Sequence, residues 1–194
     1  MISKLSEKAV ATLFANEELN EGDRELYIYG FFMLFSHLFF LTLTIFYGFL
    51  FGIIFESIVF HVIFTVLRGY AGGVHASTEK MCILSTSLSL LFCVVLIKVL
   101  GNLSSILVPT LMLAISAIII VVYSPLDSLE KPLTEAEKKL YKKKTTNSTL
   151  LFLLVSYVAM ISGLLSIYFS CAAAMLLECI LLSVGVLTKY CHTG

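Results

Sequence analysis

Residues 26–68 read LYIYGFFMLFSHLFFLTLTIFYGFLFGIIFESIVFHVIFTVLR, an apolar stretch about twice as long as one membrane crossing requires. A helix crosses a bilayer with about 20 apolar residues, so the stretch predicts two helices rather than one. The uncharged segment Gly48-Phe49-Leu50-Phe51-Gly52 is the expected turn between them. This pattern indicates an integral membrane protein.

The composition of the whole chain supports this interpretation. Of the 194 residues, 59% are hydrophobic and 13% are charged, which is about half the charge of an average soluble protein. A soluble domain of this composition would expose too much apolar surface to water. The thirteen basic and thirteen acidic residues cancel, so the net charge carries no information about nucleic acid or acidic ligands. No nucleic-acid partner is expected.

Four more apolar stretches follow, at residues 82–100, 104–123, 148–168 and 171–189, with a second uncharged turn expected near Tyr168-Phe169-Ser170. The prediction is an all-α membrane protein with about six spans in a single membrane domain over residues 1–194. A four-span arrangement, with two stretches lying at the interface, remains an alternative. Residues 1–25 are polar, lack a signal-peptide pattern, and predict a short interfacial helix.

The basic residues are distributed unequally between the connections. If the N-terminus is cytoplasmic, twelve of the thirteen fall on the inner side, and only Lys98 falls outside. The twelve are Lys4, Lys8, Arg24, Arg68, Lys80, Lys131, Lys138, Lys139, Lys142, Lys143, Lys144 and Lys189. Because cytoplasmic loops are enriched in Lys and Arg, we expect both termini inside the cell.

The longest polar connection, residues 124–147, is the predicted basic cytoplasmic loop. Within it, Thr134 and Glu137 have the spacing of a capping box, which predicts a short helix TEAEKKLYKKK. Such a helix is typical of a segment resting against anionic headgroups. A docking site for an acidic peptide is the alternative interpretation.

Residues 68–82, RGYAGGVHASTEKMC, place an arginine, three glycines, a histidine and a cysteine at a membrane boundary. Ser77 or Thr78 can cap a helix that begins near Glu79 and holds Cys82. On a straight helix, His75 and Cys82 would lie about 10.5 Å apart along the axis, too far for proton transfer. A Cys/His pair therefore requires the glycine-rich backbone to reverse. The alternative is a packed cysteine and a histidine near the headgroups.

The pattern Arg68-Gly-Tyr-Ala-Gly-Gly-x-His75-Ala, followed by Cys82, resembles the signature of the accessory gene regulator B (AgrB) family. A second stretch, Tyr123-Ser-Pro125-x-Asp-x-x-x-Lys131-Pro132-Leu, resembles that family's segment after the fourth span. Chain length and the order of apolar stretches are similar as well. The resemblance covers most of the chain.

The resemblance implies a cysteine endopeptidase of Gram-positive quorum sensing, located in the bacterial cell membrane with its active site at the cytoplasmic face. Such proteins cut the C-terminal tail from an AgrD-like precursor and keep the peptide as a thioester, which closes to a thiolactone or lactone. By this matching Cys82 is the nucleophile and His75 the base. The supporting positions are Arg68, Gly72, Gly73, Glu79 and Lys131. The resemblance also implies a homodimer, and no cofactor or metal is expected.

A runner-up interpretation needs no proteolysis. A small peptide exporter would use Arg68 and the intramembrane Glu56 and Glu178 to line a path. A lipid-binding scaffold without chemistry is a third option. The span cysteines Cys93, Cys171 and Cys179 are expected to be packing residues.

Overall fold

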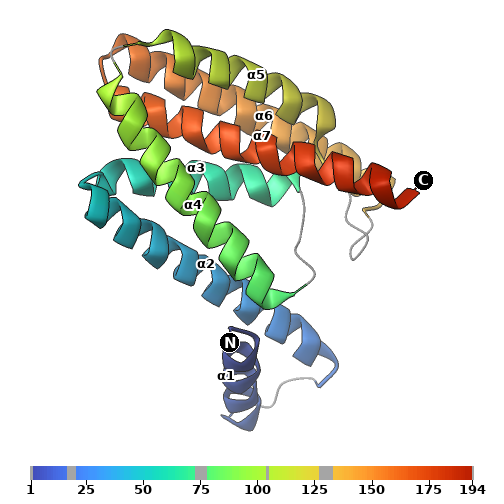
Figure 1. The fold of residues 1–194 in the computed structure, drawn as a ribbon. Coiled ribbons are helices and arrows are strands. Elements are labelled where there is room, and N and C mark those ends of the chain that lie inside the picture. Colours follow the sequence, from blue (N-terminus) through green and yellow to red (C-terminus); the bar gives the residue numbers. More distant parts are fainter. Residues whose placement is uncertain (1, 17–20, 73–77, 104, 127–132, 194) are drawn as a thin grey trace. The chain divides into compact units, whose positions relative to one another are not determined.

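The computed structural model describes residues 2–16, 21–72, 78–103, 105–126 and 133–193, and over these residues it is helical (Figure 1). The helices, in chain order, are α1 Ile2–Asn16, the 3-10 helix η1 Glu21–Asp23, α2 Arg24–Phe51, α3 Ile54–Ala71, α4 Glu79–Asn102, α5 Leu107–Tyr123, α6 Glu135–Ile161 and α7 Leu165–Thr193. The chain forms two compact units, Met1–Leu43 and Thr44–Gly194.

The first unit contains α1, η1 and the first part of α2. The polar N-terminal segment forms a helix, as expected, and it buries one face that includes Ile2, Ser6 and Val10, while Leu5 is exposed. Phe14 at the end of α1 meets Tyr27 of α2 edge to face, with ring centroids 5.7 Å apart. This geometry is a favourable aromatic contact that ties α1 to the start of α2.

The second unit is organised around α7, which packs against α3, α4, α5 and α6. Figure 1 shows α7 in red, alongside α5 and α6. The run Ser170, Cys171, Ala172, Ala173 and Ala174 in this helix is completely buried. Small side chains allow helix backbones to approach closely, so this run explains why α7 can contact four neighbours.

The predicted turn between the first two spans is found, and its two glycines have different roles. α2 continues to Phe51, and Gly52 turns the chain with a φ of 69°, a value that favours glycine. Gly48 lies inside α2, where an added Cβ would come within 2.6 Å of the Ser57 Oγ. Gly48 therefore lets α2 and α3 approach each other closely beside the turn.

The second predicted turn was placed too late in the chain. α6 ends at Ile161, Gly163 has a φ of 75°, and α7 already begins at Leu165. The expected turn at Tyr168-Phe169-Ser170 is instead helical and buried. The Tyr168 hydroxyl is satisfied by a 2.6 Å hydrogen bond with the Thr110 Oγ1 of α5, which explains how this polar group is accommodated inside the bundle.

The basic connection is also more helical than expected. Residues 124–147 do not form a loop with a separate short helix, because α6 runs without interruption from Glu135 to Ile161. The capping box itself is confirmed: Thr134 Oγ1 accepts from the Glu137 N–H, and Glu137 accepts from the Thr134 N–H. No glycine or proline interrupts residues 135–161, so the helix started by this cap continues into the apolar stretch.

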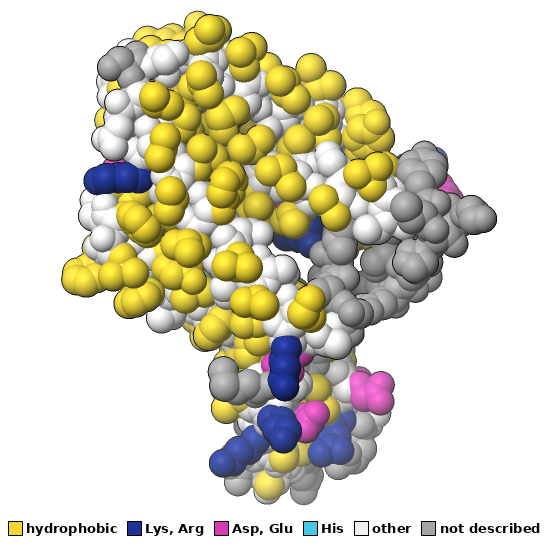
Figure 2. Space-filling model, in the orientation of Figure 1, with side chains coloured by type: hydrophobic (Ala, Val, Ile, Leu, Met, Phe, Trp, Pro, Cys, Tyr) yellow, Lys and Arg dark blue, Asp and Glu magenta, His cyan; other side chains and the backbone are white. Residues whose placement is uncertain are grey.

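The surface of the second unit is typical of a protein that lies in lipid. Large hydrophobic side chains are exposed along its helices and cover much of the face seen in Figure 2. Five helices (α2, α3, α4, α6 and α7) are long and apolar enough to cross a membrane, whereas α5 is shorter. The described chain thus has the features of a multi-pass helical membrane protein, and the exact number of crossings stays a prediction.

Candidate functional site

α3 and α4 do not form one continuous helix. A Cys/His pair requires such a break, because on a straight helix His75 and Cys82 would lie too far apart. α3 ends at Ala71, and Gly72 follows with a φ of 76°, a conformation that favours glycine. α4 begins at Glu79 after an extended Thr78. His75 and Gly73 lie outside the described residues, so the predicted pairing of His75 with Cys82 stays a prediction.

Cys82 is half-buried in the first turn of α4. The expected N-cap is confirmed at Thr78, whose Oγ1 accepts from the Met81 N–H at 3.3 Å. The Cys82 N–H donates to the Thr78 carbonyl oxygen at 3.0 Å, the first backbone hydrogen bond of the helix. Glu79 is the first helical residue. A thiol in this turn lies at the positive end of the helix dipole, where anions are stabilised.

Gly72 connects two stretches that lie far apart in the sequence, the glycine-rich motif and the segment after α5. It forms a parallel bridge with Leu126, and the Leu126 N–H donates to the Ala71 carbonyl oxygen at 2.9 Å. An added Cβ on Gly72 would lie 2.5 Å from the Leu126 carbonyl oxygen. The glycine-rich motif and the segment after α5 are therefore in direct backbone contact, which only a residue without a side chain permits.

Arg68, in the last turn of α3, joins this backbone contact to α7. Its Nη1 donates to the Gly72 carbonyl oxygen at 2.6 Å and lies 3.9 Å from the Oε1 of Glu178. Glu178 is completely buried, while the Arg68 side chain is 22% exposed. From the sequence, Glu178 is a candidate for an export path or for pairing across helices. A carboxyl group in an apolar span requires a partner. This requirement is the feature of the sequence from which the pairing of Glu178 with Arg68 could have been predicted.

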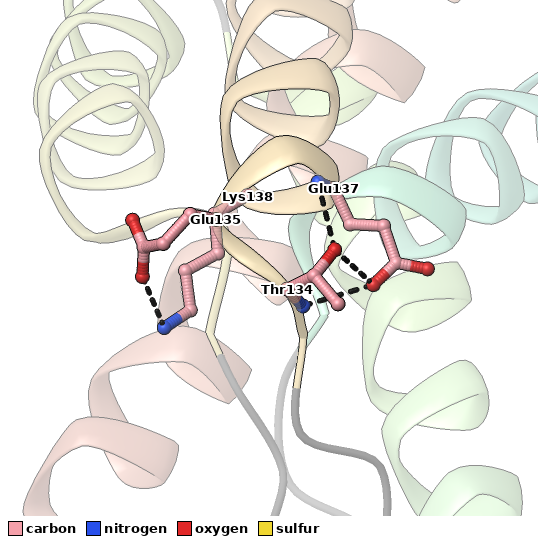
Figure 3. A network of polar contacts seen from close by, with 4 residues as sticks. All are labelled: Thr134, Glu135, Glu137 and Lys138. Atoms are coloured by element: carbon pink, nitrogen blue, oxygen red, sulfur yellow. Dashed lines mark hydrogen bonds and ion pairs between the residues drawn. The ribbon is translucent and has the colours of Figure 1, made fainter.

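The lysines of the basic segment have different roles. Lys142 donates to carbonyl oxygens at the end of α5, and the Lys144 ammonium lies 5.2 Å from the ring centroid of Tyr70 at the end of α3. Lys138 pairs with Glu135 at 3.2 Å, beside the capping box in Figure 3. A shallow pocket is lined by Pro125, Lys138, Lys139, Lys142 and Lys143. Lys131 lies outside the described residues.

Figure 1 shows the N-terminal end of α4 apart from the C-terminal end of α3. The described residues bring together Arg68, Gly72 and Leu126. Within the described parts of the chain, no group of three or more His, Cys, Asp or Glu side chains could hold a metal ion.

These features define a helical membrane protein with several spans. Its Cys82 lies at the capped start of α4, and the connection before it begins at Gly72, whose carbonyl oxygen is held by Arg68. The chain belongs to the accessory gene regulator B family, whose model matches residues 6–183. It is similar to the accessory gene regulator protein B of Staphylococcus saprophyticus, with 30% identity over 140 residues, 71% of this chain and 64% of that relative. The match thus spans less than two thirds of the relative's length. No solved structure matches the chain. The resemblance seen in the two motifs is confirmed at the level of the family.

Proposed function

We propose that this chain is a membrane cysteine endopeptidase of quorum sensing that removes the C-terminal tail of an AgrD-like precursor peptide. The observation that carries the proposal is the position of Cys82. It lies in the first turn of a helix capped by Thr78, directly after a glycine-containing break, in a chain of the accessory gene regulator B family. A helix N-terminus is an environment that favours a reactive thiolate.

In the proposed reaction, His75 takes the proton from the Cys82 thiol, and the sulfur attacks the carbonyl carbon of the scissile peptide bond. The new S–C bond forms as the C–N bond breaks, and the proton passes from His75 to the leaving amine of the tail. The precursor is then held as a thioester. A cysteine or serine within the peptide attacks this thioester, closes a thiolactone or lactone ring, and releases the free Cys82 thiol.

The supporting residues have distinct proposed roles. Arg68 and Gly72 hold the end of α3 through the 2.6 Å hydrogen bond between them. Gly73 allows the chain to continue toward His75, and Glu79 is a candidate to orient the His75 imidazole. Lys131, in the basic segment, would contribute positive charge that attracts an acidic peptide tail. The site would lie at the cytoplasmic face of the cell membrane, where thiols remain reduced.

The lysine-lined pocket on α6 suggests how the substrate is received. Among the described residues, Lys139 and Lys143 of this pocket have no ion pair or hydrogen bond. An acidic peptide tail would be attracted to such a surface. The amphipathic part of the precursor would approach along the membrane surface. A homodimer is carried over from the family as part of the proposal.

The decisive experiment is mass spectrometry of the purified protein after incubation with precursor peptide. We expect an acyl adduct on Cys82 and release of the C-terminal tail. Cys82→Ala and His75→Ala should abolish both products while membrane insertion is unchanged. Cys93→Ala is the matched control, because Cys93 lies on the same helix but is completely buried. Normal cleavage by Cys82→Ala would show that the nucleophile is assigned wrongly.

The export alternative gains no support from the two glutamates. Glu56 accepts a 2.7 Å hydrogen bond from the Ser166 hydroxyl and lies in the first turn of α3, whereas Glu178 faces Arg68 in the last turn. Both side chains are thus engaged where α3 packs against α7. Such contacts join helices.

A further inference from the structure

Glu178 is an unusual residue for the centre of a helix bundle. It is completely buried in α7, and neither of its carboxyl oxygens has a hydrogen-bond partner among the described residues. Burying a carboxyl group without hydrogen bonds opposes folding, and a leucine of similar size would pack there without that penalty. The feature that compensates for the burial is the guanidinium of Arg68, at 3.9 Å.

The same guanidinium nitrogen has a second contact, and this contact leads toward the proposed active site. Arg68 Nη1 donates to the carbonyl oxygen of Gly72, the residue that ends α3 with a positive φ. From Gly72 the chain continues through Gly73 to His75. The position of the guanidinium therefore determines where this stretch of chain begins.

We propose that Glu178 is a positioning residue for the peptidase reaction. Its carboxyl group holds Arg68 in the orientation that anchors the Gly72 carbonyl, so that α7 sets the starting point of the segment that carries His75. This inference rests on the proposed function, because a displaced His75 matters only if His75 acts on Cys82. An opposite charge buried beside a long arginine side chain attracts the guanidinium and restricts its direction.

A contrast within the same helix pair supports the assignment. Glu56 also lies between α3 and α7, but one of its oxygens accepts a hydrogen bond from Ser166. The Glu56 carboxyl group therefore already has a partner within the interface. Among the described residues, Glu178 has no such hydroxyl partner, and it faces the Arg68 guanidinium that anchors Gly72. Glu56→Gln is thus a matched control, since it removes a carboxylate from the same interface at the other end of α3.

The test measures the Cys82 thiol without any peptide substrate. The protein in lipid nanodiscs is alkylated with iodoacetamide over a range of pH, and mass spectrometry of the Cys82-containing fragment gives the rate at each pH. Alkylation follows the thiolate, so a nearby imidazolium shifts the rate profile to lower pH. Wild type, His75→Ala, Glu178→Gln, Glu178→Asp and Glu56→Gln are compared, with thermal unfolding of each as the control for folding.

We expect the Glu178→Gln profile to move toward that of His75→Ala, Glu178→Asp to lie between Gln and wild type, and Glu56→Gln to match wild type. Precursor cleavage by Glu178→Gln should fall by about tenfold or more, because a displacement on the order of 1 Å is enough for such a loss. Should Glu178→Gln fail to fold, Glu178→Asp, which keeps the carboxylate, decides the question.

The outcomes separate the two proposals. If His75→Ala differs from wild type but Glu178→Gln and Glu178→Asp follow wild type, Glu178 does not position the site, and the peptidase assignment is unaffected. If His75→Ala itself has the wild-type profile, there is no Cys/His pair, and both the proposed function and this inference are overturned. An equal shift in Glu56→Gln would reduce Glu178 to a packing residue and also overturn the inference.

Discussion

The Nζ of Lys142 lies 2.8 Å from the carbonyl oxygen of Ser124, directly after α5. It also donates to the carbonyl oxygens of Val121 and Val122 in the last turn of that helix. The last carbonyls of a helix have no partner within it, and a cation there also interacts favourably with the helix dipole. Lys142 therefore caps α5, and one lysine of the basic segment has a structural role.

We predict that Lys142→Ala lowers the free energy of unfolding by about 1–2 kcal/mol, from the lost hydrogen bonds to a charged donor and the lost dipole interaction. Lys139→Ala should change it by less than about 0.5 kcal/mol, since surface substitutions of this kind have small effects. Thermal unfolding in the same detergent compares the two. Equal melting temperatures for both variants would contradict the capping role.

The two remaining pocket lysines should affect the substrate rather than stability. We expect the double variant Lys139→Gln, Lys143→Gln to bind a precursor with an acidic tail several-fold more weakly, with a loss that diminishes as salt is added. Binding of a fluorescent peptide at two ionic strengths measures this. A peptide whose tail acids are replaced by amides is the control, and both proteins should bind it equally.

Gly72 and Gly163 are a matched pair that tests the backbone contact between Gly72 and Leu126. Both have a positive φ, but an added Cβ has nothing within 4 Å at Gly163 and lies 2.5 Å from the Leu126 carbonyl oxygen at Gly72. We predict that Gly163→Ala costs about 1–2 kcal/mol through backbone strain alone. Gly72→Ala should cost more and should also abolish precursor cleavage. Cleavage at the wild-type rate by a folded Gly72→Ala protein would show that the contact does not serve the site.

Two threonine N-caps separate helix stability from thiol reactivity. Thr78 caps the helix that carries Cys82, and Thr134 caps α6. Replacement of either by alanine should cost about 1 kcal/mol of stability. We expect only Thr78→Ala to slow the alkylation of Cys82, because it loosens the first turn of α4. Equal alkylation rates in the two variants would mean that the cap does not influence the thiol.

The six-span arrangement makes a direct prediction about sidedness. Alkaline phosphatase fused after Asn102 or after Ser162 should be active, because both positions are expected outside the cell, whereas fusion after Thr134 should be inactive. In a four-span arrangement with residues 82–100 and 104–123, or 148–168 and 171–189, at the interface, one of the outer fusions would be inactive. Fusions of green fluorescent protein at the same positions should show the opposite pattern and serve as the control.

Much of this protein could be predicted from local sequence alone. Apolar stretches, the capping box of Thr134 and Glu137, and the cap at Thr78 depend on neighbours within a few residues, and all of them are found in the structure. The errors were at boundaries. Gly163 ends α6 where an apolar run offered no visible break, and α6 continues through the polar segment because no residue in it stops a helix.

The sequence by itself determined the helical membrane class, the caps and the family motifs, since hydrophobicity, capping and motif spacing act over short distances along the chain. Only the tertiary structure decided that Glu178 faces Arg68, that Gly72 meets Leu126, and that Lys142 caps α5. Each of these contacts joins residues far apart in the chain. They exist because helix packing brings polar groups from distant parts of the chain beside one another, and no local pattern specifies which helix supplies the partner.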